Sequence, residues 1–215
     1  MLYWKKRENG RNAMALIDCS GREFTEKLAS SAAVPGGGGA AALAGALAAA
    51  LGGMVCALTA GKKKYAAVES DIRRLAEQAE SLRRELLGCV DADAAAFAPL
   101  AAAYAIPKDA TGRAETMERC LRDAAAVPLR IAECCAAVIE MQRELLDKGS
   151  ALAVSDAASG AALARGALCA AAANVRVNTR LMRDRDCAAA LDARVDALLA
   201  EFCPLADRIF EDYYK

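Results

Sequence analysis

The stretch from Val34 to Ala60, VPGGGGAAALAGALAAALGGMVCALTA, runs for 27 residues without a charge. It can be a membrane span, a glycine loop that binds a nucleotide, or a helix in the core of a soluble protein. A membrane span needs about 20 strongly apolar residues. The length suits a span, but alanine and glycine contribute little transfer free energy and no belt of aromatic residues flanks the segment. We therefore expect no membrane span.

The glycines also match the dinucleotide-binding pattern G-x-G-x-x-A, at Gly36, Gly38 and Ala41. That pattern must follow a strand and needs an acidic residue about 20 positions later. Here Pro35 and a predicted helix precede it, and the later position falls on Lys62. No G-K-[ST] follows, so the stretch is no phosphate-binding P-loop either.

A helix from about 39 to 60, buried on all sides, is the remaining prediction, since its small residues let neighbouring helices approach closely. The run that precedes this helix is Pro35, Gly36, Gly37, Gly38 and Gly39. Glycine can bring bare backbone N–H groups against a ligand. We predict that this run is a binding loop, with a flexible connection between helices as the alternative.

The composition limits the possible partners and chemistry. Lys+Arg and Asp+Glu are 28 each, so no basic field indicates nucleic acid. The nine cysteines form no C-x-x-C pair, which favours reduced thiols in the cytoplasm. The chain has no histidine, which excludes histidine general bases and histidine metal ligands. Acid–base chemistry must then use Asp, Glu, Lys, Tyr or Cys.

The hydrophobic pattern predicts one all-α domain over 16–215, a bundle of long antiparallel helices, after a disordered tail over 1–15. Few aromatic residues, 5%, fit closely packed helices better than strands. Ser20 and Glu23 form a capping box that opens a helix over 21–32. We expect Pro128 to kink or divide a helix, and Ser155 or Asp156 to cap the next one. The later helices are expected at about 65–104, 114–148, 155–182 and 187–212.

Two aspartates lie close together in the longest predicted helix. Asp91 and Asp93 are two residues apart and cannot share a helix face. Asp91 is expected to be a partly solvated surface acid. Asp93 falls in the apolar stripe, where desolvation should raise its pKa, and such carboxyl groups cluster at active sites. An ion pair of Asp93 with Arg165 or Arg176 is the alternative.

Other polar residues are candidates for ligand binding. Asn174 and Asn178 are four residues apart, so their amides share one helix face and can grip a ligand edge. A hydrogen bond between helices explains them equally well. The lysines at 62–64 can hold an anionic tail or simply end a helix in solvent.

Eight segments occur in an order typical of one family. They are FTEKLASS from Phe24, PGGG from Pro35, AALAGAL from Ala41, GKKKY from Gly61, VDADAAAF from Val90, IPK from Ile106, VPLxIAE from Val127 and NVxVN from Asn174. On these segments the chain resembles the formiminotetrahydrofolate cyclodeaminase family, which also contains methenyltetrahydrofolate cyclohydrolases. The likeness covers nearly everything from Leu16 onward. One departure is Gly39, where the family commonly has serine.

The resemblance implies a homodimer with reduced folate, including polyglutamylated forms, bound in a cleft between subunits. It implies no permanently bound cofactor and no metal. The essential aspartate of the family matches Asp93, the residue that the apolar stripe also selects. The family's formiminotransferase domain has no counterpart here, so a separate formiminotransferase is a candidate partner. The candidate substrate-binding residues are Pro35, Gly36, Gly37, Gly38, Gly39, Lys62, Lys63, Lys64, Tyr65, Asp156, Asn174 and Asn178.

The implied reaction is cyclisation of 5-formiminotetrahydrofolate to 5,10-methenyltetrahydrofolate with release of ammonia. Because amide ion is a very poor leaving group, the nitrogen must be protonated as it departs, and a carboxylic acid with a raised pKa is suited to this. The alternative is hydrolysis of the methenyl compound to 10-formyltetrahydrofolate, which needs the same acid–base group. A non-enzymatic helical scaffold is a further alternative, but it has no reason to keep Asp93 in an apolar stripe.

Overall fold

The computed structural model describes residues 15–214, and within them it contains helices and no strands. The all-α prediction is therefore confirmed for this part of the chain. The tail expected over 1–15 lies almost entirely outside the described residues. The elements are the short 3₁₀ helices η1 (Leu16–Asp18) and η2 (Lys63–Val68) and the α-helices α1 (Gly21–Leu28), α2 (Gly37–Thr59), α3 (Glu69–Tyr104), α4 (Arg113–Lys148), α5 (Val154–Thr179) and α6 (Arg185–Tyr213).

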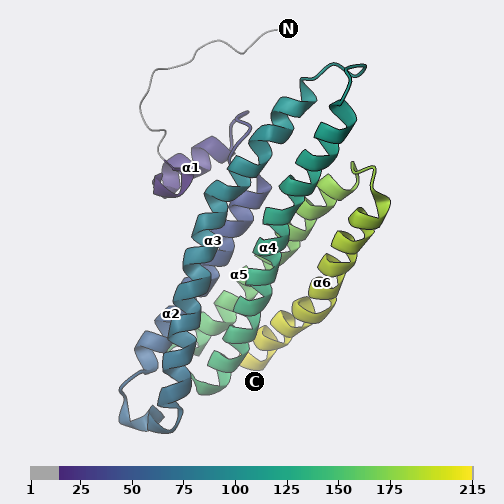
Figure 1. The fold of residues 1–215 in the computed structure, drawn as a ribbon. Helices are drawn as coiled ribbons and strands as arrows, with labels where there is room; N and C mark the ends of the chain where they lie inside the picture. The colour runs from purple at the N-terminus through teal and green to yellow at the C-terminus, as the bar shows by residue number, and fades with distance from the viewer. Residues whose placement is uncertain (1–14, 215) are drawn as a thin grey trace.

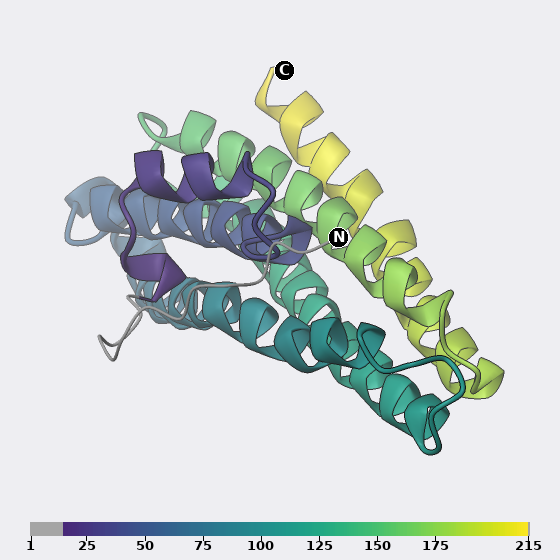
Figure 2. The same ribbon diagram turned by 90° about the horizontal axis from the view of Figure 1, so that it is seen from above.

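Helices α2 to α5 form a bundle in which successive helices run in opposite directions (Figure 1). Helix α6 packs on α4 and α5, away from α2 and α3 (Figure 2). The short α1 lies at the edge of the bundle and buries Phe24. Because α2 and α5 lie side by side in opposite directions, the start of α2 and the end of α5 meet at the same end of the bundle.

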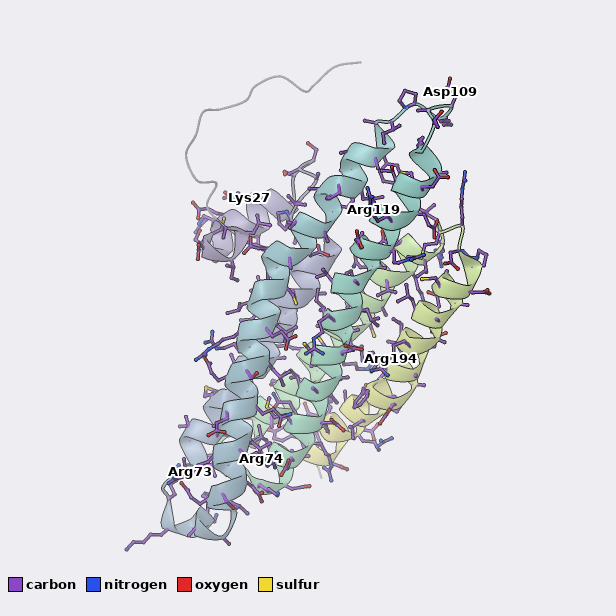
Figure 3. All side chains as sticks on the ribbon, in the orientation of Figure 1. Lys27, Arg73, Arg74, Asp109, Arg119 and Arg194 are labelled. Carbon is purple, nitrogen blue, oxygen red and sulfur yellow. The ribbon has the colours of Figure 1, made fainter. Side chains whose placement is uncertain are left out.

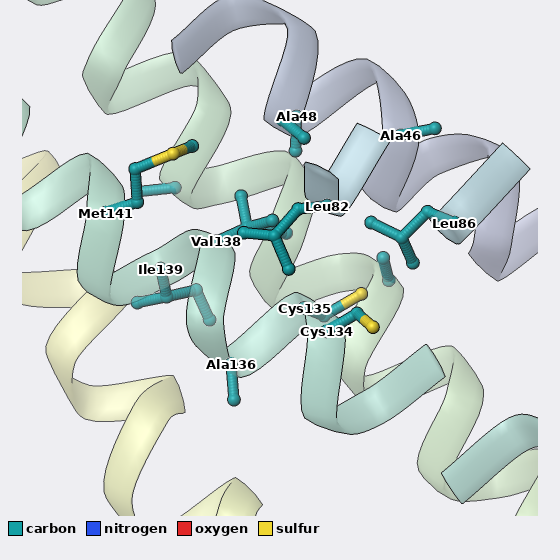
Figure 4. Packing of buried hydrophobic residues seen from close by; sticks show 14 of the residues in the cluster. Ala46, Ala48, Leu82, Leu86, Cys134, Cys135, Ala136, Val138, Ile139 and Met141 are labelled. Atoms are coloured by element: carbon teal, nitrogen blue, oxygen red, sulfur yellow. The ribbon is translucent and has the colours of Figure 1, made fainter. Parts of the chain in front are cut away.

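Small residues on α2 allow the close helix packing that the sequence predicts (Figure 4). A Cβ atom at Gly45 would lie 2.9 Å from the Cys135 sulfur on α4, and one at Gly52 would lie 2.5 Å from the Met141 methyl. Gln142 is fully buried and donates from Nε2 to the Ala48 carbonyl of α2 at 2.8 Å. Interiors pack to crystal-like density, so added methyl groups here would force the helices apart.

One face of α2 is exposed, so the prediction of a helix buried on all sides is wrong. Leu47, Met54 and Leu58 have exposed fractions of 54%, 40% and 44%. Together with the half-buried Leu43 and Leu51 they recur at spacings of three and four, which places them on one helix face. The other faces of α2 are covered by α3, α4 and α5, and nothing within the described chain covers this one.

Two stretches are long and apolar enough to cross a membrane by length and composition, Gly37–Thr59 and Lys63–Tyr104. Half of the apolar window of the first is buried inside the bundle, as in the core helix of a soluble protein. The second contains α3, which carries exposed ion pairs such as Arg73–Glu69 and Arg83–Glu80. One or two such helices are weak evidence of a membrane span, because the core helix of a soluble protein passes the same test.

Several predicted boundaries need correction. Helix α1 ends at Leu28 rather than at 32, and α3 begins at Glu69 because 63–68 forms a 3₁₀ turn. Helix α4 continues through Pro128 as one element, so the predicted division is wrong. The predicted caps at Ser155 and Asp156 are also wrong, since a turn ending at Ala153 leads directly into α5. The capping box at the start of α1 is confirmed by the bond from the Glu23 N–H to the Ser20 hydroxyl, 3.2 Å.

Candidate active site

The glycine run opens α2 and leaves backbone N–H groups free. Gly36 is the N-cap and has no side chain to accept from the first turn. The Ala40 N–H is bound by the Gly36 carbonyl at 3.0 Å, and the Gly39 N–H donates to Oδ2 of Asp93 at 3.0 Å. The N–H groups of Gly37 and Gly38 have no acceptor among the described residues. The start of α2 therefore offers two donors beside a carboxylate, at the helix end that favours negative charge.

Asp93 lies on α3, half-buried, facing the start of α2. Burial raises the pKa of Asp93 above its ordinary value, and the hydrogen bond from the Gly39 N–H opposes that rise. No cation pairs with Asp93 within residues 15–214. Arg165 instead pairs with Asp207 at 2.8 Å, and Arg176 pairs with Asp196. The ion-pair alternative is thus wrong, and the predicted desolvated carboxyl group is confirmed.

Close contact at this end of α2 requires glycine. A Cβ atom at Gly38 would lie 2.5 Å from Cγ of Asp93 and overlap its Oδ1 atom. A Cβ atom at Gly37 would lie 2.8 Å from the amide nitrogen of Asn174. At Gly39 the nearest atom would be 3.5 Å away, which is ordinary contact. Two of the four glycines are therefore fixed by the side chains that face them.

The paired asparagines belong to the last turns of α5, and the Asn174 amide lies against Gly37 at the start of α2. The Asn174 amide donates to the Ala170 carbonyl of its own helix at 2.8 Å. The Asn178 amide donates to the Asn174 carbonyl at 2.9 Å and to the Ala124 carbonyl of α4 at 3.2 Å. The second bond is the predicted link between helices. Because both NH₂ groups are engaged and neither Oδ1 atom has a donor in the described chain, the pair can accept hydrogen bonds from a ligand.

A cavity of about 150 Å³ joins these groups. Sequence reasoning missed its apolar wall, although two signals were present. Phe97 follows Asp93 by four residues and shares its helix face, and Val177 lies between the two asparagines. The remaining lining comes from the glycine loop and from α4. The cavity is lined by Ala33, Val34, Gly36, Gly37, Asp93, Phe97, Ala124, Pro128, Asn174, Val177 and Asn178.

A larger hollow of about 720 Å³ lies on the outer face of α3. Its polar lining consists mainly of charged side chains, among which Glu80 and Arg84 form an ion pair. This hollow is an open surface depression and contains none of the predicted site residues. The smaller cavity is the stronger candidate because it encloses a carboxyl group with a raised pKa.

The other predicted binding residues lie at the opposite end of the bundle. Lys62–Lys64 follow α2 directly, and at 1.5 Å per residue its 23 residues span about 34 Å. Tyr65 accepts a hydrogen bond from the Ala151 N–H at 2.9 Å, which lowers its pKa and ties η2 to the turn before α5. Asp156 lies in the first turn of α5. None of these residues reaches the Asp93 cavity of its own subunit.

None of the nine cysteines lines this cavity. All nine cysteines are free thiols, and burial raises the pKa of Cys56 to about 11 and that of Cys134 to about 12. Thiols with such pKa values are protonated near neutral pH and poor nucleophiles. Within residues 15–214 no three His, Cys, Asp or Glu side chains are grouped to share a metal ion. Asp93 is the titratable group that the cavity contains.

The fold and site define a helical-bundle enzyme with a half-buried carboxyl group facing the start of a helix. Residues 20–197 match the family model described as formiminotransferase-cyclodeaminase, so the chain belongs to that family.

Three known proteins extend the comparison. A methenyltetrahydrofolate cyclohydrolase of Methylorubrum extorquens is 42% identical over 87% of this chain and 92% of its own length. The mouse formimidoyltransferase-cyclodeaminase is 34% identical over 87% of this chain, which spans only 35% of that protein. The crystal structure of formiminotetrahydrofolate cyclodeaminase from Thermotoga maritima matches 93% of this chain and all of its own, with a TM-score of 0.82 and 25% identity.

Proposed function

We propose that the protein is a folate-dependent one-carbon enzyme in which Asp93 transfers protons at the carbon between folate N5 and N10. The observation that carries this proposal is the desolvated, unpaired Asp93 carboxyl group in a cavity beside the glycine-rich start of α2. Family membership supports the substrate class. The nine free thiols favour a cytoplasmic setting.

The cavity suits the ring end of a reduced folate. Phe97, Pro128 and Val177 form apolar walls that a flat heterocycle can contact. The free Oδ1 atoms of Asn174 and Asn178 can accept from N–H groups, and the edge of a pterin carries such donors. This arrangement would bring the reactive carbon, rather than the remote end of the folate, near Asp93.

For hydrolysis, the Asp93 carboxylate takes a proton from a water molecule as its oxygen attacks the methenyl carbon. The C–N5 bond then breaks, and the Asp93 carboxylic acid returns that proton to N5. Loss of the remaining hydroxyl proton to solvent gives 10-formyltetrahydrofolate, and the carbon keeps its oxidation state throughout. General acid–base catalysis of this kind contributes about 10²–10⁴-fold to the rate.

For cyclodeamination, N10 attacks the formimino carbon, and the N10 proton passes to the formimino nitrogen, which becomes an amine. Asp93 in its acid form then protonates the departing nitrogen, so that ammonia leaves and the methenyl bridge remains. This second reaction would need a formiminotransferase to supply its substrate. The solved Thermotoga maritima structure favours it, whereas the 42% identity over 92% of the cyclohydrolase favours hydrolysis. We give hydrolysis first place on that identity.

The absorbance of methenyltetrahydrofolate distinguishes the reactions directly. The purified protein should bleach added methenyltetrahydrofolate faster than buffer does if it is a cyclohydrolase. It should instead generate that absorbance from 5-formiminotetrahydrofolate if it is a cyclodeaminase. Failure with both substrates, in a protein with the helical circular dichroism of this fold, would refute the proposed function.

A homodimer is the second part of the proposal. Helix α5 packs beside α2 and also carries exposed apolar side chains, since Leu163 and Val177 have exposed fractions of 42% and 56%. Large exposed apolar faces usually mark an interface, and two-fold dimers are the most common assembly. Light scattering should give about twice the chain mass of 22.4 kDa. A monomer that turns over folate would contradict this part.

A further inference from the structure

Two of the nine thiols touch each other where α5 packs against α6. The Sγ atoms of Cys169 on α5 and Cys203 on α6 lie 3.7 Å apart, a hydrogen-bonding contact between sulfurs. Cys169 is exposed and Cys203 is half-buried, so small molecules in solvent can reach the pair. Neither cysteine lines the Asp93 cavity, so the pair has no part in the chemistry derived for that site.

Charged side chains flank the thiol pair on both helices. Arg165 lies one turn before Cys169 on α5, and Asp207 lies one turn after Cys203 on α6. The two charged groups form an ion pair at 2.8 Å. The pKa of Arg165 is raised first by Asp207 and further by both thiols, so its cation lies close enough to interact with either sulfur. A neighbouring cation stabilises a thiolate, which is the nucleophilic form of cysteine.

The two sulfurs differ in accessibility and in acidity. Burial, and secondly the contact with Cys169, raise the pKa of Cys203 to about 11, so this thiol keeps its proton near neutral pH. Cys169 is the sulfur that faces solvent, where an oxidant arrives first. An accessible cysteine with a second cysteine beside it is the arrangement in which an oxidised sulfur is captured as a disulfide. Cys169 therefore suits the attacking role, and Cys203 suits the role of the thiol that captures it.

Helix α6 is held to the bundle by a small apolar surface and by exposed ion pairs. Of its 29 residues it buries only Ala188, Val195, Phe202, Ala206 and Ile209. Arg194 reaches from α6 to Glu133 of α4 at 3.1 Å (Figure 3). Exposed pairs of this kind contribute little to stability. A covalent bond between α5 and α6 would therefore add substantially to the attachment of α6.

We propose that Cys169 and Cys203 form a reversible oxidation site, at which a peroxide joins the two sulfurs in a disulfide that fastens α6 to α5. The Cys169 thiolate attacks one peroxide oxygen, and the O–O bond breaks to give a sulfenic acid and hydroxide, which takes up the proton that the Cys169 thiol lost. The Cys203 sulfur then attacks the Cys169 sulfur. The S–O bond breaks, and the released hydroxide takes the Cys203 proton to form water. Two thiols are thus oxidised while one hydrogen peroxide is reduced to two water molecules, and a thiol reductant restores the pair.

Treatment of the reduced protein with one equivalent of hydrogen peroxide tests this proposal. Each chain should lose two thiols and the mass of two hydrogen atoms, and dithiothreitol should restore both thiols. Trypsin cleaves after arginine, so the disulfide should appear in mass spectra as a link between peptides 166–176 and 195–208, each of which holds one cysteine. The oxidised protein should melt about 5 °C or more above the reduced protein. A disulfide between other cysteines or between two chains, or an unchanged melting temperature, would overturn the proposal.

Matched variants separate the pair from the other thiols. In Cys203→Ser, peroxide should leave Cys169 as a sulfenic acid that dimedone traps, with no rise in melting temperature. Cys187→Ser changes another half-buried thiol of α6 and should still form the disulfide. Arg165→Gln should slow the loss of thiols by roughly threefold or more, because it removes the cation beside the pair, whereas the exposed Arg208→Gln should not. A Cys203→Ser protein that forms an intramolecular disulfide as fast as the wild type would overturn the proposal.

Discussion

The two ends of the bundle differ in how the structure uses their polar groups. We call the end with the glycine loop, Asp93, Asn174 and Asn178 the catalytic end, and the end with Lys62–Lys64 the lysine end. At the catalytic end a carboxyl group lies half-buried without a cation, and backbone N–H groups at the start of α2 lack acceptors. At the lysine end the charges are exposed, and the backbone around them is tied down by Tyr65. Desolvation changes the pKa of a group, whereas exposure keeps its charge available to a mobile partner. The first arrangement suits proton transfer and the second suits attraction of an anion.

The largest effect is expected from Asp93→Asn. This change preserves the volume of the side chain and removes the transferable proton. We expect kcat to fall by about 10²-fold or more with little change in KM, because the interaction lost belongs to the transition state. Initial rates of methenyltetrahydrofolate hydrolysis over a range of substrate concentrations measure kcat and KM of the variant and the wild type.

Asp91→Asn is the matched control for that change. Asp91 accepts a hydrogen bond from the Leu16 N–H at 2.6 Å and lies outside the cavity. Its replacement should therefore act mainly on the attachment of η1 and only mildly on the rate. Equal losses in the two variants would show that the rate reports the folding of α3 rather than proton transfer by Asp93.

A smaller loss is expected from Gly38→Ala. The added methyl group would overlap the Asp93 carboxyl group, which must move, and a displaced acid–base group commonly costs about 10-fold or more in kcat. Gly88→Ala is a suitable control, since a Cβ atom there meets nothing within 4 Å. It should keep the activity and raise the melting temperature slightly, because alanine favours helices. Full activity of Gly38→Ala would mean that the position of Asp93 matters little.

Leu47→Glu tests the exposed face between the two ends. A charge at the centre of the exposed apolar face of α2 should shift the proposed dimer towards monomer. Light scattering measures this shift. Ala200→Glu on the exposed side of α6 should leave the mass in solution unchanged. A Leu47→Glu protein that remains a dimer would place the interface elsewhere.

The smallest effect concerns stability. Burial raises the pKa of Asp93 in the folded state above its unfolded value, so its favourable contribution exists below the unfolded pKa and is lost as pH rises through the folded pKa. Asparagine does not ionise. Asp93→Asn should thus be more stable than the wild type near pH 7, and the difference should shrink below about pH 4. Denaturant unfolding at both pH values measures this, and a destabilised variant at pH 7 would contradict it.

Local sequence patterns predict most of the fold and the centre of the site. Periodic apolar residues give the helices, and a charge in an apolar stripe identifies Asp93, because both signals depend on near neighbours in the chain. Patterns of this kind do not report distance between segments. The separation of Lys62–Lys64 from Asp93 depends on the length and direction of α2 within the bundle. The exposed leucine face of α2 was missed for a similar reason, since composition alone does not tell a helix buried by its own chain from one that a second subunit covers.

The most direct test of the account is a carbon-13 NMR titration of the aspartate carboxyl groups. Comparison with Asp93→Asn assigns the Asp93 resonance. The account predicts that its midpoint lies clearly above the ordinary aspartate value of about 3.9, because desolvation outweighs the Gly39 hydrogen bond. A midpoint at or below that value would mean a solvated or stabilised carboxylate, and would contradict Asp93 as the buried acid–base group of the site.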